Sequence, residues 1–296
     1  MTALARRPKP AERSIVEGEF PFTDDDFSRI AAMLHGEAGI ALPESKATLA
    51  YSRLAKRLRA LGLASFKDYC ALVASATGVS ERQKMVAALT TNVTRFFREP
   101  HHFEHLRERV LPPLLAAARH GAAVRLWSAG CSSGQEPFSA AMTILDLAPD
   151  AAELDIKILA TDIDPNMVEQ GRQGVYPGRA TQEAPAPFRH RWFKAQGPGR
   201  DQVCVADEVR ALVAFRELNL IGPWPMKGRF DAIFCRNVVI YFEEDTQARV
   251  WNRFAPMLAP NGALYIGHSE RVTGPAAGQL TPDGITTYRP RPGASS

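Results

Sequence analysis

Hydrophobic and polar positions change their spacing about a third of the way along the chain. Between residues 20 and 92, apolar side chains recur every three or four positions, which is typical of helices that pack on one side. From Val124 onward, short apolar runs alternate with helical stretches, the pattern of a parallel sheet covered by helices on both faces. The sequence therefore predicts an all-helical unit followed by a larger α/β unit.

Helix-start signals divide the first unit. Thr23 precedes three aspartates and is expected to cap a helix that ends near Gly36. A second helix is expected over residues 45–61, and a third opens at Ser65. Ser80 and Gln83 have the spacing of a capping box for a fourth helix.

The α/β unit is expected to contain five strands, three helices and one insertion. The strands are Val124–Trp127, Ile156–Ala160, Leu212–Phe215, Phe230–Cys235 and Ala263–Ile266. The helices are Glu136–Leu147, Pro165–Gln173 and Asp245–Leu258. Residues 178–211 are rich in proline, glycine and charge, and they contain the alternating segment Gln202–Ala206. We interpret them as an inserted, hairpin-like lobe, the alternative being a flexible loop.

These patterns give the domain boundaries that we expect. They are a flexible tail at 1–19, a helical domain at 20–92, a linker and helix at 93–120, an α/β domain at 121–290 with its insert at 178–211, and a tail at 291–296. The long helix over residues 101–119 must bend or break at Pro112-Pro113, because proline cannot donate a backbone hydrogen bond.

Composition narrows the functional class only slightly. The 296 residues are 45% hydrophobic and 23% charged, which excludes a mostly disordered chain. No apolar run is long enough to cross a membrane, and the basic start is not followed by the apolar core of a secretory signal. The four cysteines form no CxxC pair, so we expect neither a zinc site nor disulfides. The net charge of +4 arises within the first hundred residues and favours an acidic partner there.

A glycine turn follows the first strand of the α/β unit. Gly130 and Gly134 stand in the spacing Gly-x-x-x-Gly, which matches neither the dinucleotide GxGxxG nor the phosphate-binding GxxxxGK[ST] pattern. Taken alone, this turn could equally serve packing or a ligand. Asp162 ends the next strand, where a carboxylate can accept both hydroxyls of a ribose, whereas Asp164 before Pro165 is expected to cap a helix.

Polar residues also end the strand 230–235. Arg236, Asn237 and then Tyr241 follow it abruptly, although surface pairing of Arg236 and packing of Tyr241 would be the structural alternative. Together with a turn that lacks a phosphate signature, they suggest a ligand with a ribose and no phosphate. S-adenosylmethionine fits, and Arg98 and Glu136 are candidates for its carboxylate and ammonium groups.

Five motifs in order resemble those of the CheR-type chemotaxis protein methyltransferases. They are TTNVTRFFREPHHF at 90–103, WSAGCSSGQEP at 127–137, ATDID at 160–164, FDAIFCRNVVIYF at 230–242 and GHSE at 267–270. Gln135 departs from the family, because many relatives have a second acid beside Glu136. The resemblance extends from about residue 22 to 290 and implies a doubly wound, Rossmann-like class I methyltransferase sheet. It also implies an N-terminal all-helical domain and a small inserted β-subdomain.

The resemblance implies a function and a set of site residues. A cytoplasmic enzyme, recruited to membrane receptor arrays, would transfer a methyl group from S-adenosylmethionine to glutamates on chemoreceptor helices, leaving S-adenosylhomocysteine. The implied cofactor contacts are Asn92, Thr94, Arg98, Glu136, Asp162, Asn219, Leu220, Arg236 and Asn237. Tyr241 would lie near the transferred methyl group; it could orient the substrate carboxylate, as could Arg98. The β-subdomain can hold a receptor C-terminal peptide in this family.

A basic stripe on the second helix is a candidate receptor contact. Arg53, Lys56 and Arg57 share one side of that helix with Lys46, whereas Leu54, Leu58 and Leu61 form its apolar side. A solvated face is the simpler interpretation of such a cluster, but the resemblance favours a surface that meets the acidic receptor helix.

Three other functions share some of these features. An RNA methyltransferase would use the same cofactor, but no surface of basic and aromatic residues is evident. A non-catalytic module that senses the cofactor is the second, and a nicotinamide dehydrogenase, which would need GxGxxG, is the third.

Overall fold

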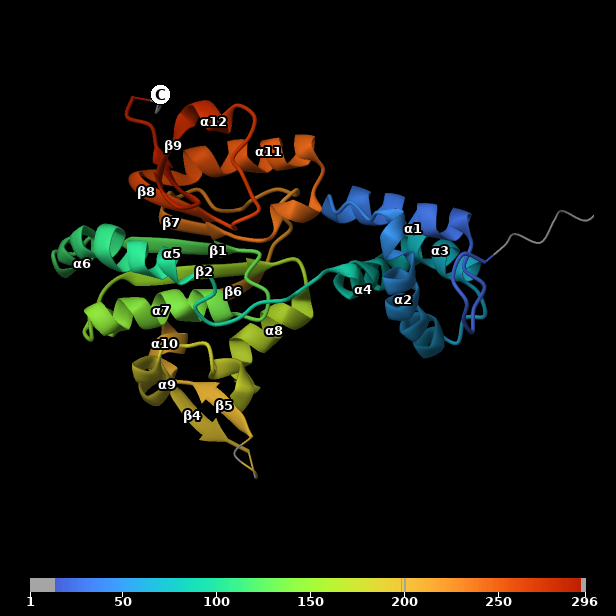
Figure 1. The fold of residues 1–296 in the computed structure, drawn as a ribbon, viewed down its shortest axis with the longest axis horizontal. Coiled ribbons are helices and arrows are strands. Elements are labelled where there is room, and N and C mark those ends of the chain that lie inside the picture. Colours follow the sequence, from blue (N-terminus) through green and yellow to red (C-terminus); the bar gives the residue numbers. More distant parts are fainter. Residues whose placement is uncertain (1–13, 198, 200, 294–296) are drawn as a thin grey trace, which may run out of the picture. The chain divides into compact units, whose positions relative to one another are not determined.

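The structure is a computed structural model that describes residues 14–197, 199 and 201–293. The described residues form two compact units, one ending at Thr90 and the other beginning at Thr91 (Figure 1). The expected tails lie partly outside the description, at residues 1–13 and 294–296. Residues 14–19 are not loose as expected, because Ile15 donates a backbone hydrogen bond to Phe22 and Glu19 pairs with Arg59.

The first unit consists of α-helices joined by short 3-10 turns. They are α1 (Asp24–Ala38), η1 (Glu44–Lys46), α2 (Ala47–Leu61), α3 (Phe66–Ala74), η2 (Ala76–Gly78) and α4 (Val79–Leu89). Apolar residues of the first three α-helices, among them Leu34, Leu54 and Phe66, are fully buried. The helical spacing in the sequence thus predicted this unit correctly.

The helix ends of this unit show which local sequence signals predicted the start and end of each helix correctly. Thr23 caps α1, as expected, and also forms a complete capping box with Asp26, while Ser65 caps α3. Helix α1 continues past Gly36 to Gly39, whose φ of 72° is the left-handed conformation that ends helices. The capping box expected at Ser80 is wrong: α4 begins one residue earlier, at Val79, with no side-chain cap.

The second unit is built on a seven-stranded sheet in the order β6-β2-β1-β7-β8-β10-β9 (Figure 1). Its strands are β1 (Val124–Ala129), β2 (Ile156–Asp162), β6 (Val213–Glu217), β7 (Phe230–Cys235), β8 (Leu258–Ile266), β9 (Leu280–Gly284) and β10 (Thr287–Pro290). The first five in the order run parallel, and β10 is antiparallel to both its neighbours. The five expected strands are therefore confirmed as the parallel part, whereas the sequence reading missed the final hairpin.

Helices cover both faces of this sheet. Leu126 on β1 belongs to the core shared with Phe138 of α7 (Gln135–Leu147). The next residue, Trp127, lies on the opposite face, with its ring 5.1 Å from that of Phe254 on α11 (Glu244–Phe254). This unit also contains helices α8 (Pro165–Gln173), α10 (Asp207–Ala211) and α12 (Ala276–Gln279), with 3-10 turns η4 (Ala151–Glu153), η6 (Val239–Tyr241) and η7 (Ala255–Met257). The doubly wound α/β class is confirmed.

The proline pair interrupts the helix before the sheet. Helix α5 (Pro100–His105) continues through a π turn, η3 (Leu106–Val110), into α6 (Leu111–Arg119). Pro112 and Pro113 occupy the first turn of α6, where their missing N–H groups have no helical partner to lose. The expected break is therefore a wide turn followed by a new helix start.

The inserted lobe is an ordered three-stranded antiparallel sheet. Its order is β3 (Val175–Pro177), β5 (Gln202–Val205), β4 (Phe193–Gln196), with η5 (Gly178–Thr181) and α9 (Ala186–Trp192) between the strands. The expected hairpin is thus present as β4 and β5, and a third strand lies just before the expected boundary at residue 178.

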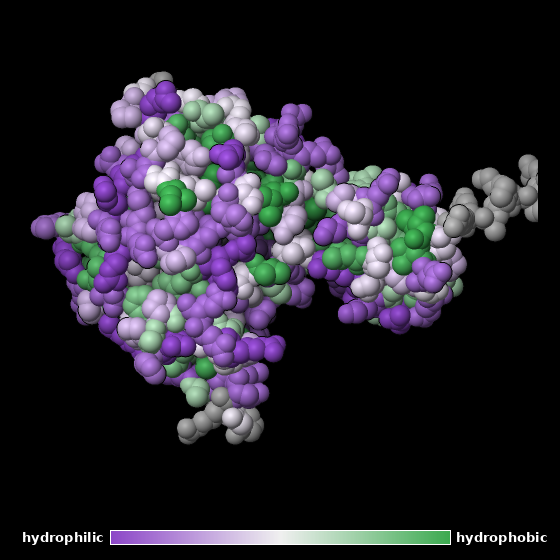
Figure 2. All heavy atoms as spheres, in the orientation of Figure 1, coloured by the Kyte–Doolittle hydropathy of each residue, from purple (hydrophilic) through white to green (hydrophobic). Residues whose placement is uncertain are grey.

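The surface of this unit is mainly polar in the view of Figure 2, with apolar side chains in small separate groups. Val93 and Ile285, 79% and 71% exposed, are the most exposed of the large hydrophobic residues described. None of the described helices combines the length and the hydropathy that crossing a bilayer requires.

Candidate active site

The expected cofactor residues of the second unit gather where the parallel strands end. Strands β6, β2, β1 and β7 are neighbours, and the carboxyl ends of parallel strands lie at the same edge of a sheet. Asp162 is the last residue of β2, Arg236 directly follows β7, and Asn219 follows β6. Ligands of open α/β sheets bind at this edge.

The glycine turn after β1 is shaped by close contacts. Gly130 and Gly134 have φ angles of 78° and 96°, which disfavour any side chain. A Cβ atom on Gly130 would lie 2.4 Å from Val238 Cγ2, in the segment after β7. Glycine at 130 therefore lets the turn after β1 approach the segment after β7.

Asp162 holds this turn in place. Its Oδ2 accepts a 2.7 Å hydrogen bond from the Ser132 amide, and its Oδ1 accepts one of 2.9 Å from the Asp164 amide. Burial raises the pKa of Asp162, although these amides oppose the shift. Asp164 caps α8 through the Asn166 amide, as expected, and also accepts from Asn92 Nδ2.

The segment 92–99 crosses this edge in an unusual backbone conformation. Phe97 and Glu99 have φ angles of 52° and 56°. The Asn92 carbonyl accepts from the Ser132 hydroxyl, and the Phe97 amide donates to Ser139 Oγ at 2.9 Å. Arg98 directly follows the second anchor, and its Nη1 donates to the Val93 carbonyl at 3.1 Å.

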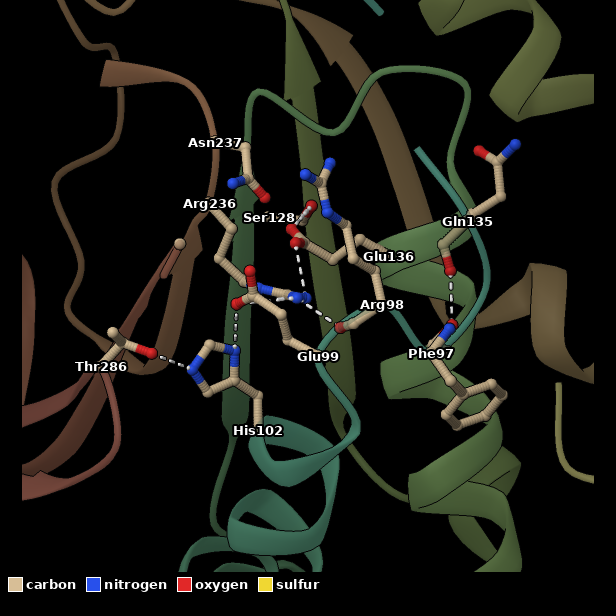
Figure 3. A network of polar contacts seen from close by, with 12 residues as sticks. Phe97, Arg98, Glu99, His102, Ser128, Gln135, Glu136, Arg236, Asn237 and Thr286 are labelled. Atoms are coloured by element: carbon tan, nitrogen blue, oxygen red, sulfur yellow. Dashed lines mark hydrogen bonds and ion pairs between the residues drawn. The ribbon is translucent and has the colours of Figure 1, made fainter. Parts of the chain in front are cut away.

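Glu136 and Arg236 form the centre of a buried polar network (Figure 3). Glu136 Oε1 accepts from the Ser128 hydroxyl at 2.7 Å, and Oε2 accepts from Arg236 Nη1 at 3.2 Å. Arg236, with a side chain 1% exposed, also donates to the Arg98 carbonyl. Burial raises the pKa of Glu136 even though Arg236 and Ser128 favour its charged form.

Glu99 is the second carboxylate of this network. Its Oε2 lies 3.3 Å from Arg236 Nη2 and 3.5 Å from His102 Nδ1, and its Oε1 accepts from His268 Nδ1 at 3.0 Å. Burial would raise the pKa of Glu99, but the His268 hydrogen bond and the Arg236 charge together lower it. Burial and the charge of Arg236 lower the pKa of His102 to about 3, so this imidazole stays neutral.

Glu270 fixes the polar segment after β7. Its carboxylate accepts hydrogen bonds of 2.5 to 3.0 Å from the amides of Gly267, Asn237, Val238 and Val239. Four amide donors on one buried carboxylate hold Asn237 at a left-handed φ of 59°. The sequence reading quoted Glu270 within a motif without giving it a role, as it did Glu99 and His102, because their partners are distant in sequence.

The remaining expected residues occupy neighbouring loops. Asn219 Oδ1 accepts from the Ile221 amide, and the buried Leu220 offers its carbonyl to Trp224 and Arg253. Tyr241 is half-buried and ends η6, two residues after Val239, the last residue of this segment whose amide donates to Glu270. Thr94 is half-buried in the segment that carries Arg98.

The basic stripe of the first unit is not the free surface that the sequence suggested. Arg57 donates two hydrogen bonds to Glu81, and Arg53 donates to the carbonyls of Ala88 and Thr90. Arg57 therefore holds α2 to the first turn of α4, and Arg53 holds it to the last turn. Lys56 is exposed, as is Lys46, so these two lysines are the cations of the stripe that still face solvent.

Among the described residues, one group of potential metal ligands comes together. Donor atoms of Glu99, His101 and His102 all lie within 4.8 Å of one another. The guanidinium of Arg236 already lies 3.3 Å from Glu99 Oε2, so a metal ion bound by Glu99 would be repelled by the charge of Arg236. We assign no metal to this group.

The comparisons with known proteins identify the family. Residues 25–90 match the family model described as CheR methyltransferase, all-alpha domain, and residues 92–285 match CheR methyltransferase, SAM binding domain. This chain belongs to the CheR methyltransferase family. The CheR resemblance seen in the sequence is thereby confirmed, and S-adenosylmethionine is the cofactor of the second unit.

Relatives support the CheR assignment over nearly the whole chain. A probable chemotaxis protein methyltransferase of Rhizobium etli is 54% identical over 258 residues, which is 87% of this chain and 96% of the relative. Chemotaxis protein methyltransferase 2 of Pseudomonas aeruginosa is 42% identical over 274 residues, 92% and 95% of the two chains. The chemotaxis protein methyltransferase of Escherichia coli is 40% identical over 252 residues, 84% and 85%.

The residues at the sheet edge fit the cofactor of a CheR enzyme. Asn237 Oδ1 is buried without a hydrogen-bond partner among the described residues. Glu136 supplies a buried carboxylate, and Arg98 carries a guanidinium towards the same end of the network as Asn237 (Figure 3). The opposite charges of Glu136 and Arg98 and the unused acceptor of Asn237 suit S-adenosylmethionine, which is an amino acid joined to a nucleoside.

Proposed function

We propose that this protein transfers the methyl group of S-adenosylmethionine to glutamate side chains of chemoreceptors, forming glutamyl methyl esters during sensory adaptation. The observation that carries the proposal is the meeting of Asp162, Glu136 and Arg236 at one sheet edge of a CheR-family chain. Methyl transfer would take place at the chemoreceptor arrays of the membrane.

We assign cofactor binding to the residues of this edge and of the segment before it. They are Asn92, Thr94, Arg98, Glu136, Asp162, Asn219, Leu220, Arg236 and Asn237. Asp162 uses one lone pair of each oxygen on a backbone amide, so each oxygen can still accept a ribose hydroxyl. Glu136 would meet the ammonium group and Arg98 the carboxylate of the amino-acid end.

Methyl transfer to a glutamate requires the substrate carboxylate to be positioned, but it does not require a general base. S-adenosylmethionine supplies a methyl group on a positively charged sulfur when it is bound. A glutamate side chain is already ionised at neutral pH, so no residue needs to remove a proton. Holding this carboxylate in line with the methyl group can contribute several kcal/mol. Tyr241 is the residue that we expect to orient it, and exclusion of water would favour a reaction that neutralises charge.

Receptor binding would involve both the helical unit and the lobe. Lys56 and Lys46 are exposed on or beside α2 and can meet the acidic residues of a methylatable helix. In the lobe, β4 lies at the edge of its sheet and exposes Lys194, so an extended receptor C-terminal peptide could add a strand there.

Methyl transfer to receptor-containing membranes tests the proposal. Protein, membranes and methyl-labelled S-adenosylmethionine should give receptor bands whose label is released by mild alkali as methanol, because esters hydrolyse under these conditions. Replacing the acceptor glutamates by alanine should abolish labelling. Alkali-stable label would point to another acceptor, label in RNA to an RNA methyltransferase, and cofactor binding without any transfer to a sensing module.

A further inference from the structure

Backbone strain in this protein is concentrated around one group of side chains. Among the described residues, the non-glycine positions with positive φ are Phe97, Glu99, Ser132, Asn237 and Thr286. Phe97 and Glu99 flank Arg98, Ser132 donates to Asp162, and Thr286 Oγ1 lies 2.9 Å from His102 Nε2. Such conformations are strained and persist where the surrounding contacts enforce them. Their concentration indicates that this region must keep one arrangement.

Glu99 connects the segments that meet there. Its own segment carries Arg98, its Oε2 lies 3.3 Å from Arg236 after β7, and its Oε1 accepts from His268 after β8. Arg236 in turn donates to the Arg98 carbonyl and to Glu136 (Figure 3). One carboxylate thus links three segments of the candidate site.

The charges of this buried group do not cancel. Arg236 contributes one positive charge, whereas Glu99 and Glu136 contribute two negative charges, and the neutral His102 adds none. Because Arg236 is shared between two carboxylates, neither of them is fully compensated. Glu136 therefore keeps part of its negative charge for a cation supplied by a ligand.

We infer that Glu99 is a positioning residue for cofactor binding. By sharing Arg236, Glu99 limits how far this guanidinium neutralises Glu136, and so leaves Glu136 available to the ammonium group of the cofactor. The inference rests on the cofactor role that we propose for Glu136, but it is independent of the identity of the methyl acceptor.

Two ligands that differ at the amino-acid end test this role. S-adenosylhomocysteine carries the ammonium group, and 5′-methylthioadenosine shares the thioether nucleoside but lacks the amino acid. Glu99→Gln should weaken S-adenosylhomocysteine binding about tenfold and change 5′-methylthioadenosine binding less than twofold, as measured by calorimetry. Loss of packing alone would weaken both ligands alike, and that result would overturn the inference.

Two further variants complete the cycle. Glu136→Gln should produce the same selective loss, and Glu99→Gln should then add little in the Glu136→Gln background. Glu104→Gln, the same change at an exposed position on the adjoining helix α5, should leave both affinities unchanged. Full additivity of the two losses would overturn the indirect role of Glu99. An unselective Glu136→Gln variant would remove the basis of the inference and of the Glu136 assignment together.

A milder variant keeps the test open if Glu99→Gln does not fold. His268 is 68% exposed, so His268→Ala should leave folding intact while removing the 3.0 Å hydrogen bond to Glu99. We expect a two- to threefold loss of S-adenosylhomocysteine affinity with unchanged 5′-methylthioadenosine affinity. If His268→Ala binds each of the two ligands with the same affinity as wild type, the positioning role is contradicted. A difference in receptor methylation alone, at unchanged ligand affinities, would also contradict it.

Discussion

Arg57 on α2 holds the carboxylate of Glu81 on α4 through two parallel hydrogen bonds, of 2.9 and 2.7 Å. Tyr69 donates a third to the same carboxylate, at 3.2 Å, and the Glu81 side chain is only 7% exposed. A bidentate pair with a buried carboxylate is the strong form of this interaction. Arg57 is therefore part of the framework of the helical unit.

Arg57→Ala should lower the free energy of unfolding of the helical unit by roughly 2 kcal/mol, because it leaves a buried carboxylate unpaired. Lys56→Ala, at the exposed neighbouring position, should change it by less than about 0.5 kcal/mol. Urea denaturation of the two variants provides the comparison. In methylation assays, Lys56→Ala should raise the KM for receptor and leave S-adenosylhomocysteine affinity unchanged. Equal stability of both variants would show that the ion pair is not structural.

Asp162 combines a structural and a binding role, so two substitutions are needed. Asp162→Ala leaves the amides of Ser132 and Asp164 without their acceptor, and we expect lower stability together with at least a tenfold weaker S-adenosylhomocysteine affinity. Asp162→Asn keeps one oxygen acceptor and should retain more stability while still losing affinity. Calorimetric titration and thermal unfolding separate these effects. Unchanged affinity in both variants would contradict ribose binding.

Tyr241→Phe removes a hydroxyl and keeps the ring. If Tyr241 orients the acceptor carboxylate, the rate of methyl transfer should fall about tenfold or more, because one hydrogen bond to a charged group is lost. The affinity for S-adenosylhomocysteine should stay within twofold of wild type. Rapid-quench measurement with labelled cofactor tests the transfer step. A loss of cofactor affinity at an unchanged transfer rate would place Tyr241 in the cofactor site instead.

His102 predicts a pH effect on stability. Its pKa is about 3 in the folded protein and near 6.5 in an unfolded chain, so the unfolded state binds more protons between these values. Stability from this group is present above pH 6.5 and is lost as the pH falls. The stability difference between wild type and His102→Gln should shrink by roughly 2 kcal/mol from pH 7 to pH 5. A difference that stays constant over this range would show that His102 takes up protons while folded.

The sequence predicted elements whose signals are local. Thr23 and Asp26 cap α1 as residues three positions apart, and each of the five parallel strands contains a short, mainly apolar run. The final hairpin was missed because Thr281-Pro-Asp-Gly284 carries polar and turn residues within β9, and this strand is fixed by pairing with β10. Pairing partners are a tertiary property that the local pattern does not contain.

The candidate site was predicted as a set of residues but not as a network. The positions of Asp162 and Arg236 at strand ends followed from the fold class. Their partners did not: Glu99 reaches Arg236 across 137 positions of the chain, and Glu270 reaches the amides 31 to 33 positions before it. The intramolecular partners of the basic stripe were missed for a related reason, since helical spacing places Arg57 on a face but does not reveal that Glu81 pairs with it there.

The lobe is joined to the sheet edge by aromatic packing. The ring of Phe96 lies 5.2 Å from that of Tyr176 and 4.9 Å from that of Phe193, and Phe97 stacks on Phe188 at 5.1 Å. Deleting this lobe to obtain a smaller enzyme would expose Phe96 and Phe97, which directly precede Arg98. A shortened version would therefore need replacement hydrophobic cover for them, and simply closing the gap between β3 and α10 would not suffice.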